Sequence, residues 1–362
     1  MKRLSLLFLL TVASGCAPSP PISTQVEGYG AQIEGYGKNA QGGAGKPVCV
    51  VRSNIDECFH PGNRVTNKTI VFATDTVSPP PGNRYIGSNV TLDGCAWGRN
   101  GVTIKQPGDA KRAIIIEGPA SNVVVRCIRF EGQVGGKRPG AKTESDLLAL
   151  DGTNGIVSEV LVDRVTTVGA NDGALDITGN VSDVTVQRTL IYGTPKAQLI
   201  KYGSRRRISL HHNVYIGNGE RNPQIHGDAQ EIDFVSNIVD ECSITKDGVG
   251  NGFSPYGLRI EHIQGTVVAN VVDNFLGCRS QIIGSGGRIY TSGNAGLGAF
   301  EGNADEPNPV PSAFAINPTP VEDLASTLGN VGSPNRTPDD ESRLNAVTVA
   351  LAAWRNAALQ RP

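Results

Sequence analysis

Short runs of apolar residues recur through the middle of the chain at a nearly constant spacing. They begin at Val123, Val160, Val184, Ile208 and Ile232, so the first interval is 37 residues and each of the next three is 24. Short β-branched runs of this kind, bounded by Gly and Asn, are typical of β-strands. A repeat of this length predicts a solenoid of stacked coils rather than a helical array.

The predicted fold class is all-β, a right-handed parallel β-helix over residues 28–330. A leucine-rich repeat is the nearest alternative, but the sequence lacks the leucine spacing that it requires. Residues one coil apart become neighbours in space, because adjacent strands lie about 4.8 Å apart. Asn213, Asn237 and Asn270 each precede two apolar residues, which predicts a ladder of stacked asparagine side chains.

The start of the chain has the features of an export signal. A basic start and an apolar run lead to Ala13-Ser14-Gly15-Cys16, and small residues directly before a cysteine are typical of a bacterial lipobox. We therefore predict a signal peptide over residues 1–15, acylation of Cys16, and a lipid-anchored tether over residues 16–27. The apolar run is too short to span a bilayer. The expected location is the bacterial outer membrane or cell surface, and secretion without an anchor is the alternative.

The last segment, residues 331–362, is predicted to be an extension outside the solenoid. Leu344, Val347, Leu351 and Trp354 recur at helical spacing, which predicts a short helix with one apolar face. We expect this face to pack against the outside of the β-helix.

The composition favours the same architecture. The chain has 362 residues, of which 38% are hydrophobic and only 5% aromatic, with 45 Gly and 22 Pro. This is typical of many short strands joined by turns, not of a helix bundle. The net charge is −1, so no overall field attracts nucleic acid or an anionic membrane. We expect a monomer with no nucleic-acid partner, which contacts a membrane through its lipid anchor alone.

Six cysteines follow Cys16, an even number in a chain predicted to be exported. Disulfides are expected, because exported proteins meet an oxidising environment. The sequence contains no pair of cysteines separated by two residues, so a zinc site is not expected. The sequence leaves the pairing open.

Charged residues recur at the same interval as the strands. Asp146, Asp172, Lys196 and Arg221 are separated by 26, 24 and 25 residues. Because this interval matches the coil, the four residues are predicted to form one column on successive coils.

Glu144 and Asp176 lie close to the acidic end of this column. Carboxylates on adjacent coils repel one another unless a cation lies between them, and a ligand set made of oxygens favours Ca²⁺. Lys196 and Arg221 extend the column with positive charge, which suits a ligand with several carboxylates, such as an acidic polysaccharide. Two alternatives stay open: the carboxylates face solvent, or the two cations form salt bridges with them.

Several segments resemble a known family, in the same order along the chain. They are Gly35–Gly43 (GYGKNAQGG), Val160–Arg164 (VLVDR, similar to VWIDH), Asp172–Asp176 (DGALD, similar to DGxxD), Ile208–Gly227 (ISLHHNVYIGNGERNPQIHG, with a counterpart of RxPxxR), and a weaker trace at Val331–Arg336. Over residues 35–285 the chain resembles the pectate lyases of polysaccharide lyase family one, in a bacterial lipoprotein form.

The resemblance implies a calcium-dependent enzyme that cleaves α-1,4-linked polygalacturonate by β-elimination. Carried over residue by residue, it implies Ca²⁺ ligands at Glu144, Asp146, Asp172 and Asp176, a substrate-binding lysine at Lys196, and a catalytic base at Arg221. His226 takes the place of the second arginine of RxPxxR, and is expected to contact the substrate. This replacement leaves open whether the substrate is pectate, methylated pectin or another uronate polymer.

Two other functions fit a β-helix. A glycoside hydrolase acting on pectin would need two carboxylates placed as acid and base, and the repeat region contains no adjacent Asp-Asp pair. A non-catalytic surface protein that binds polysaccharide would keep the coils but would not need Lys196 and Arg221. His211 and His212 alternate on one predicted strand, so one of them is expected to face the core.

Overall fold

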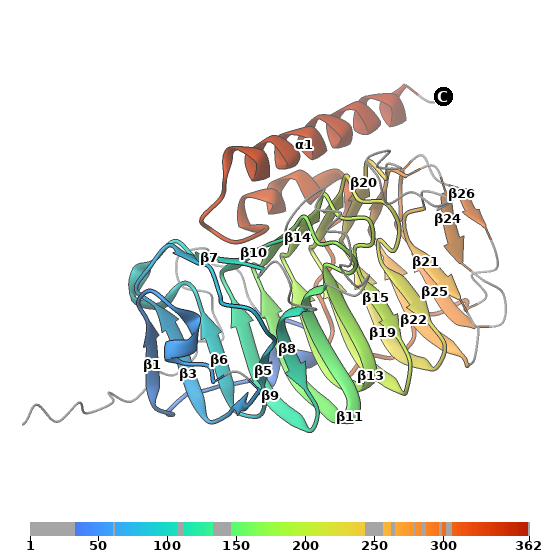
Figure 1. Ribbon diagram of the computed structural model, residues 1–362. Coiled ribbons are helices and arrows are strands. Elements are labelled where there is room, and N and C mark those ends of the chain that lie inside the picture. Colours follow the sequence, from blue (N-terminus) through green and yellow to red (C-terminus); the bar gives the residue numbers. More distant parts are fainter. Residues whose placement is uncertain are drawn as a thin grey trace, which may run out of the picture.

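The computed structural model describes most of the chain. The described residues are 33–60, 62–106, 112–132, 146–242, 256–261, 265–278, 280–283, 287–296, 299–301 and 306–360. Their strands coil around one axis and form a parallel β-helix, which confirms the predicted fold class (Figure 1). Cys16, the predicted signal peptide and tether, and Glu144 lie outside the described residues.

The coils build three faces of parallel strands. The first face pairs β2 (Arg64–Val65), β5 (Arg84–Ile86), β8 (Arg112–Glu117), the start of β11 (Asp146–Asp163), the start of β13 (Leu175–Gln187), β15 (Leu199–Lys201), β18 (Gln224–His226), β21 (Arg259–Glu261), β24 (Ser280–Ile283) and β26 (Ala299–Glu301). The second face pairs β1 (Val48–Val51), β3 (Lys68–Phe72), β6 (Val90–Asp93), β9 (Ala120–Arg126), the ends of β11 and β13, β16 (Arg205–His211), β19 (Ala229–Val235), β22 (Val267–Val272) and β25 (Arg288–Ser292). The third face pairs β4 (Thr76–Val77), β7 (Val102–Lys105), β10 (Ile128–Glu131), β12 (Thr166–Val168), β14 (Leu190–Tyr192), β17 (Val214–Ile216), β20 (Ile238–Asp240) and β23 (Phe275–Leu276). Helical segments are η1 (Tyr36–Asn39), η2 (Ile55–Glu57), η3 (Ala96–Gly98), η4 (Val321–Asn330) and α1 (Pro338–Leu359).

The strand starts that the sequence predicts stack in register. Val123, Val160, Val184, Ile208 and Ile232 are direct partners on successive strands of the second face. All five are fully buried, and each such side chain contributes about 1.5–3 kcal/mol relative to an exposed one. The pairing therefore explains the repeat: the same inward position needs an apolar side chain on every coil.

Pairing is kept although the coils differ in length. The interval from Val123 to Val160 is 37 residues, and Ile232 pairs with Ala269, again 37 residues away. In both longer coils the additional residues lie between a third-face strand and the next first-face strand, after β10 and after β20. These two 37-residue coils thus gain their length at the same corner of the solenoid.

An asparagine ladder lines the start of the third face, and one of its members differs from the prediction. Asn213 Nδ2 donates to Asn237 Oδ1 (3.0 Å), and Asn237 Nδ2 donates to Asn274 Oδ1 (3.1 Å). Asn270 lies in β22 and donates to the carboxylate of Asp233 (2.8 Å). The predicted place of Asn270 in the ladder is wrong, because the intervening coil is four residues longer than its motif suggests.

The six cysteines form three disulfides, as predicted. The pairs are Cys49–Cys58, Cys95–Cys127 and Cys242–Cys278. Each joins residues that are at most 36 apart in the sequence, so each links the same or neighbouring coils. The covalent bonds hold local segments together rather than distant ends of the solenoid.

The segment with the glycine-rich motif crosses the outside of the second face. Tyr36 N donates to Ser209 Oγ (3.2 Å), and Gly37 N donates to Thr185 Oγ1 (2.9 Å). A Cβ atom on Gly37 would lie 2.2 Å from the carbonyl oxygen of Val160. Glycine is needed here because any side chain would hold the two backbones apart.

The predicted C-terminal helix is confirmed. A capping box formed by Thr337 and Asp340 begins α1, with Pro338 at its first position. The helix lies along the third face beside η4 (Figure 1), and one apolar cluster joins the three elements: Leu190, Val214, Ile216, Ile238, Leu324, Leu328, Leu344, Val347 and Leu351. Helix and η4 together keep third-face apolar residues from water.

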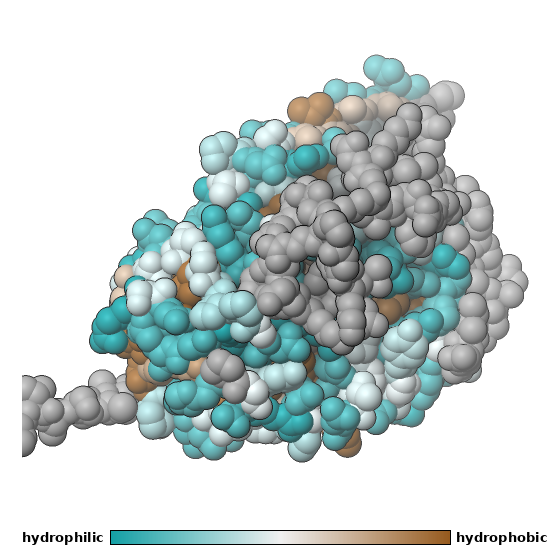
Figure 2. All heavy atoms as spheres, in the orientation of Figure 1, coloured by the Kyte–Doolittle hydropathy of each residue, from teal (hydrophilic) through white to brown (hydrophobic). Residues whose placement is uncertain are grey.

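On the face drawn in Figure 2 the described atoms are largely hydrophilic, with only small apolar patches. Within the described ranges, no helix has both the length and the apolar character that a bilayer crossing requires.

Candidate active site

The candidate residues lie on the outward side of the first face. Side chains alternate across a strand, so Ile177 and Ile200 point into the core, where both are fully buried. Asp176 and Thr178 on β13, and Lys201 on β15, therefore point outward. The outward side of β11, β13, β15 and β18 is the surface on which the predicted column has to be sought.

The structure brings the four predicted column residues together, with offsets of one residue. Gly173 pairs with Lys196, and Lys196 pairs with Glu220. Asp146 joins this row, because its Oδ1 accepts a hydrogen bond from Gly173 N (3.0 Å). Asp172 therefore lies one residue before the row, and Arg221 lies one residue after it. The regular interval predicted which residues lie close together, but not the one-residue offsets between them.

Two of the acids are paired with cations. Lys196 Nζ lies 2.5 Å from Asp172 Oδ1, so the alternative in which the lysine pairs with an acid of the neighbouring coil holds in this structure. Arg112 Nε lies 3.0 Å from Asp146 Oδ2, and its Nη1 lies 2.7 Å from Asp151 Oδ2. Positive charge thus compensates the acidic end of the column.

Burial keeps two of the carboxylates from ionising easily. Desolvation raises the pKa of Asp146 to about 6, opposed by the charge of Arg112 and assisted by that of Asp172. The pKa of Asp176 is raised well above its usual range, first by burial and then by the charge of Asp146. Leu199 N donates to Asp176 Oδ1 (2.9 Å), which offsets part of the burial cost. Asp146, Asp172 and Asp176 thus lie close enough for the charge of one carboxylate to raise the pKa of another.

This region is not a closed metal site. Among the residues that the structure describes, no three acidic, histidine or cysteine side chains are arranged to hold a metal ion. Asp146 and Asp172 are directed to Arg112 and Lys196 instead. The fourth predicted ligand, Glu144, lies outside the described residues.

Arg221 is weakly held. Its backbone has φ of +64°, a conformation shared by other non-glycine residues of this solenoid, such as Asp183 and Arg207. Its Nε makes no hydrogen bond within the described part of the chain and lies 3.5 Å from Glu220 Oε1. Glu220 in turn accepts a hydrogen bond from the hydroxyl of Tyr256 (3.2 Å). The guanidinium is near the surface of the site and is not fixed by a tight ion pair.

His226 is tightly bound by its neighbours. Its Nε2 lies 2.7 Å from Glu261 Oε2, and Glu261 also accepts hydrogen bonds from Arg259 and from Gln224. Burial lowers the pKa of His226, and the charge of Lys201 lowers it further, while Glu261 acts in the opposite direction. The ring is therefore neutral at neutral pH and does not replace the charge of an arginine.

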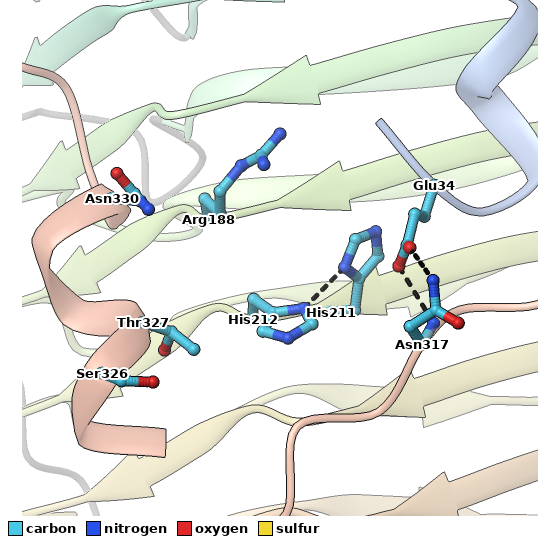
Figure 3. Close-up of a pocket in the computed structure, with 8 residues that line it drawn as sticks. All are labelled: Glu34, Arg188, His211, His212, Asn317, Ser326, Thr327 and Asn330. Atoms are coloured by element: carbon cyan, nitrogen blue, oxygen red, sulfur yellow. Dashed lines mark hydrogen bonds between the residues drawn. The ribbon is translucent and has the colours of Figure 1, made fainter. Parts of the chain in front are cut away.

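A separate pocket of about 260 Å³ lies between the end of β16 and η4 (Figure 3). It contains none of the predicted site residues; its lining is Glu34, Arg188, His211, His212, Asn317, Ser326, Thr327 and Asn330. The expectation that one histidine faces the solenoid core is wrong, because Leu210 takes the inward position and His211 lies in this pocket. Burial lowers the pKa of His211 well below its usual range and that of His212 to about 4, so both rings are neutral.

Known proteins resemble this chain in sequence. It is 28% identical to a probable pectate lyase C from Aspergillus terreus over 222 residues, which cover 59% of this chain and 46% of that protein. It is 26% identical to a probable pectate lyase C from Emericella nidulans over 264 residues, which cover 69% of this chain and 56% of that protein. The chain spans about half the length of these curated relatives. No family model matches it.

Solved structures resemble it in fold. Jun a 1, the major allergen from cedar pollen, superposes with a TM-score of 0.61 at 15% identity, covering 83% of this chain and 93% of the allergen. A pectate lyase variant from Xanthomonas campestris superposes with a TM-score of 0.57 at 17% identity, covering 83% and 98%. A pectate lyase from a Bacillus species, in complex with trigalacturonate, gives 0.53 at 14% identity, covering 83% and 99%.

This chain has the pectate lyase fold. The predicted resemblance to pectate lyases is thereby confirmed, in sequence by the curated relatives and in architecture by the solved structures.

Sequence reasoning missed three charged residues at this site: Arg112, Lys201 and Glu261. Arg112 and Glu261 precede or follow coils of irregular length, so no constant interval points to them. Lys201 could have been found, because it precedes His226 by 25 residues, the same interval that separates Lys196 from Arg221.

Proposed function

We propose that the chain is a Ca²⁺-dependent pectate lyase that cleaves α-1,4-linked polygalacturonate by β-elimination, with Arg221 as the base. The observation that carries the proposal is the grouping of Arg221 and Lys196 with Asp146, Asp172 and Asp176 on the outward side of the first face. Two cationic side chains beside a cluster of carboxylates suit a polymer that carries one carboxylate on each sugar. The pectate lyase names of the sequence relatives support the same activity.

In this reaction Arg221 removes the proton on C5, which lies next to the uronate carboxylate. The C4–O bond breaks, its electron pair leaves on the glycosidic oxygen, which takes a proton from water, and a C4=C5 double bond forms. A guanidinium is protonated in water, so the reacting species is the small neutral population of a strong base. The loose contacts of Arg221 leave its guanidine nitrogens available for this step.

Lys196 stabilises the charge that develops. The electrons of the broken C5–H bond spread onto the uronate carboxylate, and a fixed ammonium near this group lowers the energy of the transition state. Lys196 lies in register with Glu220, the residue before Arg221, so base and cation reach the same sugar from adjacent coils.

The carboxylate oxygens near Asp176 are the type of ligand atom that a hard cation prefers. It offers oxygen atoms alone, and burial together with mutual repulsion raises the pKa of Asp146 and of Asp176. Asp146, Asp172, Asp176 and Glu144 would hold Ca²⁺, and Asp172 would then exchange Lys196 for the ion. When bound, Ca²⁺ supplies positive charge that makes the C5 proton more acidic.

One assay tests this function against its alternatives. Purified protein is incubated with polygalacturonate, and the ultraviolet absorbance of the unsaturated product is followed with Ca²⁺ and with excess chelator. We expect absorbance that grows with Ca²⁺ and stops with chelator. New reducing ends without ultraviolet absorbance would identify a hydrolase, and binding without cleavage of any uronate polymer would identify a non-catalytic protein; either result contradicts the proposal.

Asp176→Asn is expected to stabilise the metal-free protein while it weakens Ca²⁺ binding. The folded state holds a proton on Asp176 at pH values where the unfolded chain has lost it, so ionisation opposes folding as pH rises above about 4. At pH 8 with chelator, asparagine should therefore raise the free energy of unfolding. Thermal unfolding at pH 8 and calorimetric titration with Ca²⁺ measure the two effects.

Asp183→Asn is the control for this substitution. Asp183 lies in a salt bridge with Arg207 on the second face (2.6 Å), and side-chain hydrogen bonds to Arg207 and Ser182 outweigh its burial and lower its pKa. Its replacement should reduce stability at pH 8 and leave Ca²⁺ binding unchanged. If Asp176→Asn behaves in the same way, the proposed cation site is wrong.

Export with a lipid anchor at Cys16 stays a proposal about residues outside those described. Three disulfides in the folded domain support an oxidising, extracytoplasmic location. Metabolic labelling with a radioactive fatty acid, compared with Cys16→Ala, tests the anchor directly.

A further inference from the structure

A second row of charged residues crosses the outward side of the first face beside the candidate active site. Thr178 pairs with Lys201, and His226 pairs with Glu261. Because Ile200 pairs with Ile225, Lys201 is the neighbour of His226 in this row. The row lies two residues beyond Asp176 along β13, which is about 7 Å at the rise of a β-strand.

Lys201 differs from His226 and Arg259 in its contacts. Among the described residues, none of the acidic side chains forms a salt bridge with it, whereas Arg259 and His226 both contact Glu261. Its ammonium lies over the ring of Tyr202, whose centroid is 4.9 Å from Lys201 Nζ. An unpaired ammonium over an aromatic ring is suited to bind an anionic ligand.

Tyr202 offers the second element of a sugar site. Tyr202 is 58% exposed although it is a large aromatic residue. The turn that carries it is held from below by Arg205, a buried side chain that donates to the carbonyl oxygens of Tyr202, Gly203 and His226. A rigid turn that presents an exposed ring is preorganised, so binding to it costs little conformational entropy.

The row also explains how the site can work without the second arginine of RxPxxR. His226 is neutral and its Nε2 is taken by Glu261. Lys201 places a full positive charge one coil away from that position. The charge that the motif would supply at residue 226 is thus present on the neighbouring strand.

We propose that Lys201 and Tyr202 form a binding site for one uronate unit of the polymer, in which the Lys201 ammonium pairs with the carboxylate and the Tyr202 ring packs on the sugar. This proposal rests on the proposed function for the identity of the polymer. Lys201 acts here as a specificity residue, because it distinguishes a free carboxylate from its methyl ester.

The test measures binding of a galacturonate oligomer by calorimetry, with Arg221→Ala as the parent protein so that the ligand is not cleaved. Adding Lys201→Gln should weaken binding at least about 10-fold, since a hydrogen-bonded ion pair is lost. Adding Lys201→Arg should restore most of the affinity. For a methyl-esterified oligomer, Lys201→Gln should change the affinity less than about twofold, whereas Tyr202→Ala should weaken binding of both ligands.

Lys105→Gln is the matched control, because Lys105 is a half-exposed lysine on β7 of the third face. It should leave both affinities unchanged. Equal affinity of parent and Lys201→Gln, an equal loss on the esterified oligomer, or no binding of either oligomer would overturn the inference. The two proposals can fail separately. If the wild-type protein cleaves polygalacturonate but oligomer binding does not depend on Lys201, this binding site alone is refuted. If oligomer binding depends on Lys201 but the wild-type protein cleaves no polymer, the lyase function alone is refuted.

Discussion

Arg221→Ala is expected to reduce the kcat of polygalacturonate cleavage by about 10²- to 10⁴-fold, the usual contribution of a general base. Arg221 lies beside the acidic cluster, and, unlike the side chains of Arg112 and Lys196, its Nε forms no hydrogen bond within the described residues. Removing the side chain leaves Lys196 and the carboxylates in place, so substrate binding should weaken far less than turnover. Initial rates of product absorbance over a range of substrate concentrations separate kcat from KM.

Arg206→Ala provides the comparison for this experiment. Arg206 is a half-exposed arginine on β16, with Asp228 3.8 Å away, and it lies on the second face. Its loss removes the same charge from the protein without touching the site, so kcat should be unchanged. If Arg221→Ala retains more than about a tenth of the wild-type kcat, another residue is the base.

Asp340→Ala is expected to lower the free energy of unfolding by about 3 kcal/mol. Asp340 is almost completely buried. One oxygen accepts from the hydroxyl of Tyr192 (2.7 Å) and the other from Arg129 Nε (3.2 Å). Its removal leaves the Arg129 charge buried with a poorer partner and also removes the capping box of α1. Urea unfolding followed by circular dichroism measures the loss.

Asp339→Ala tests whether position, not charge, causes this effect. Asp339 precedes Asp340 in the same helical turn, but it is 59% exposed and lies 3.8 Å from Arg343. Such exposed pairs contribute less than about 1 kcal/mol. Similar losses for the two variants would show that α1 is not anchored through Asp340.

The sequence was sufficient to predict the solenoid, because one physical requirement repeats on every coil. Val160, Val184 and Ile208 fill the same inward position on stacked strands, so the period of the apolar residues is the length of the coil. The same period placed Lys196 near Asp172 and Arg221, although the sequence could not show that Lys196 pairs with Asp172.

Positions near coils of irregular length were harder to predict. Asn270 has the local motif of the ladder, yet Asn274 occupies the place, because the coil before it is 37 residues long. Arg112 was missed for the same reason, since it pairs with Asp146 across 34 residues. A local motif and a constant interval point to the same residue only where the coils have equal lengths. Ion pairs between neighbouring strands can be predicted only when the register of these strands is known.

Variable coil length has an evolutionary consequence. The two longer coils gain their residues at the corner that leads into the first face, and the strands on both sides keep their partners. Segments can be inserted or deleted beside the outward side of the first face without a change in the hydrogen-bonded frame that carries Arg221 and Lys201. Descendants of this fold can thus change in length at this corner while they inherit the same core.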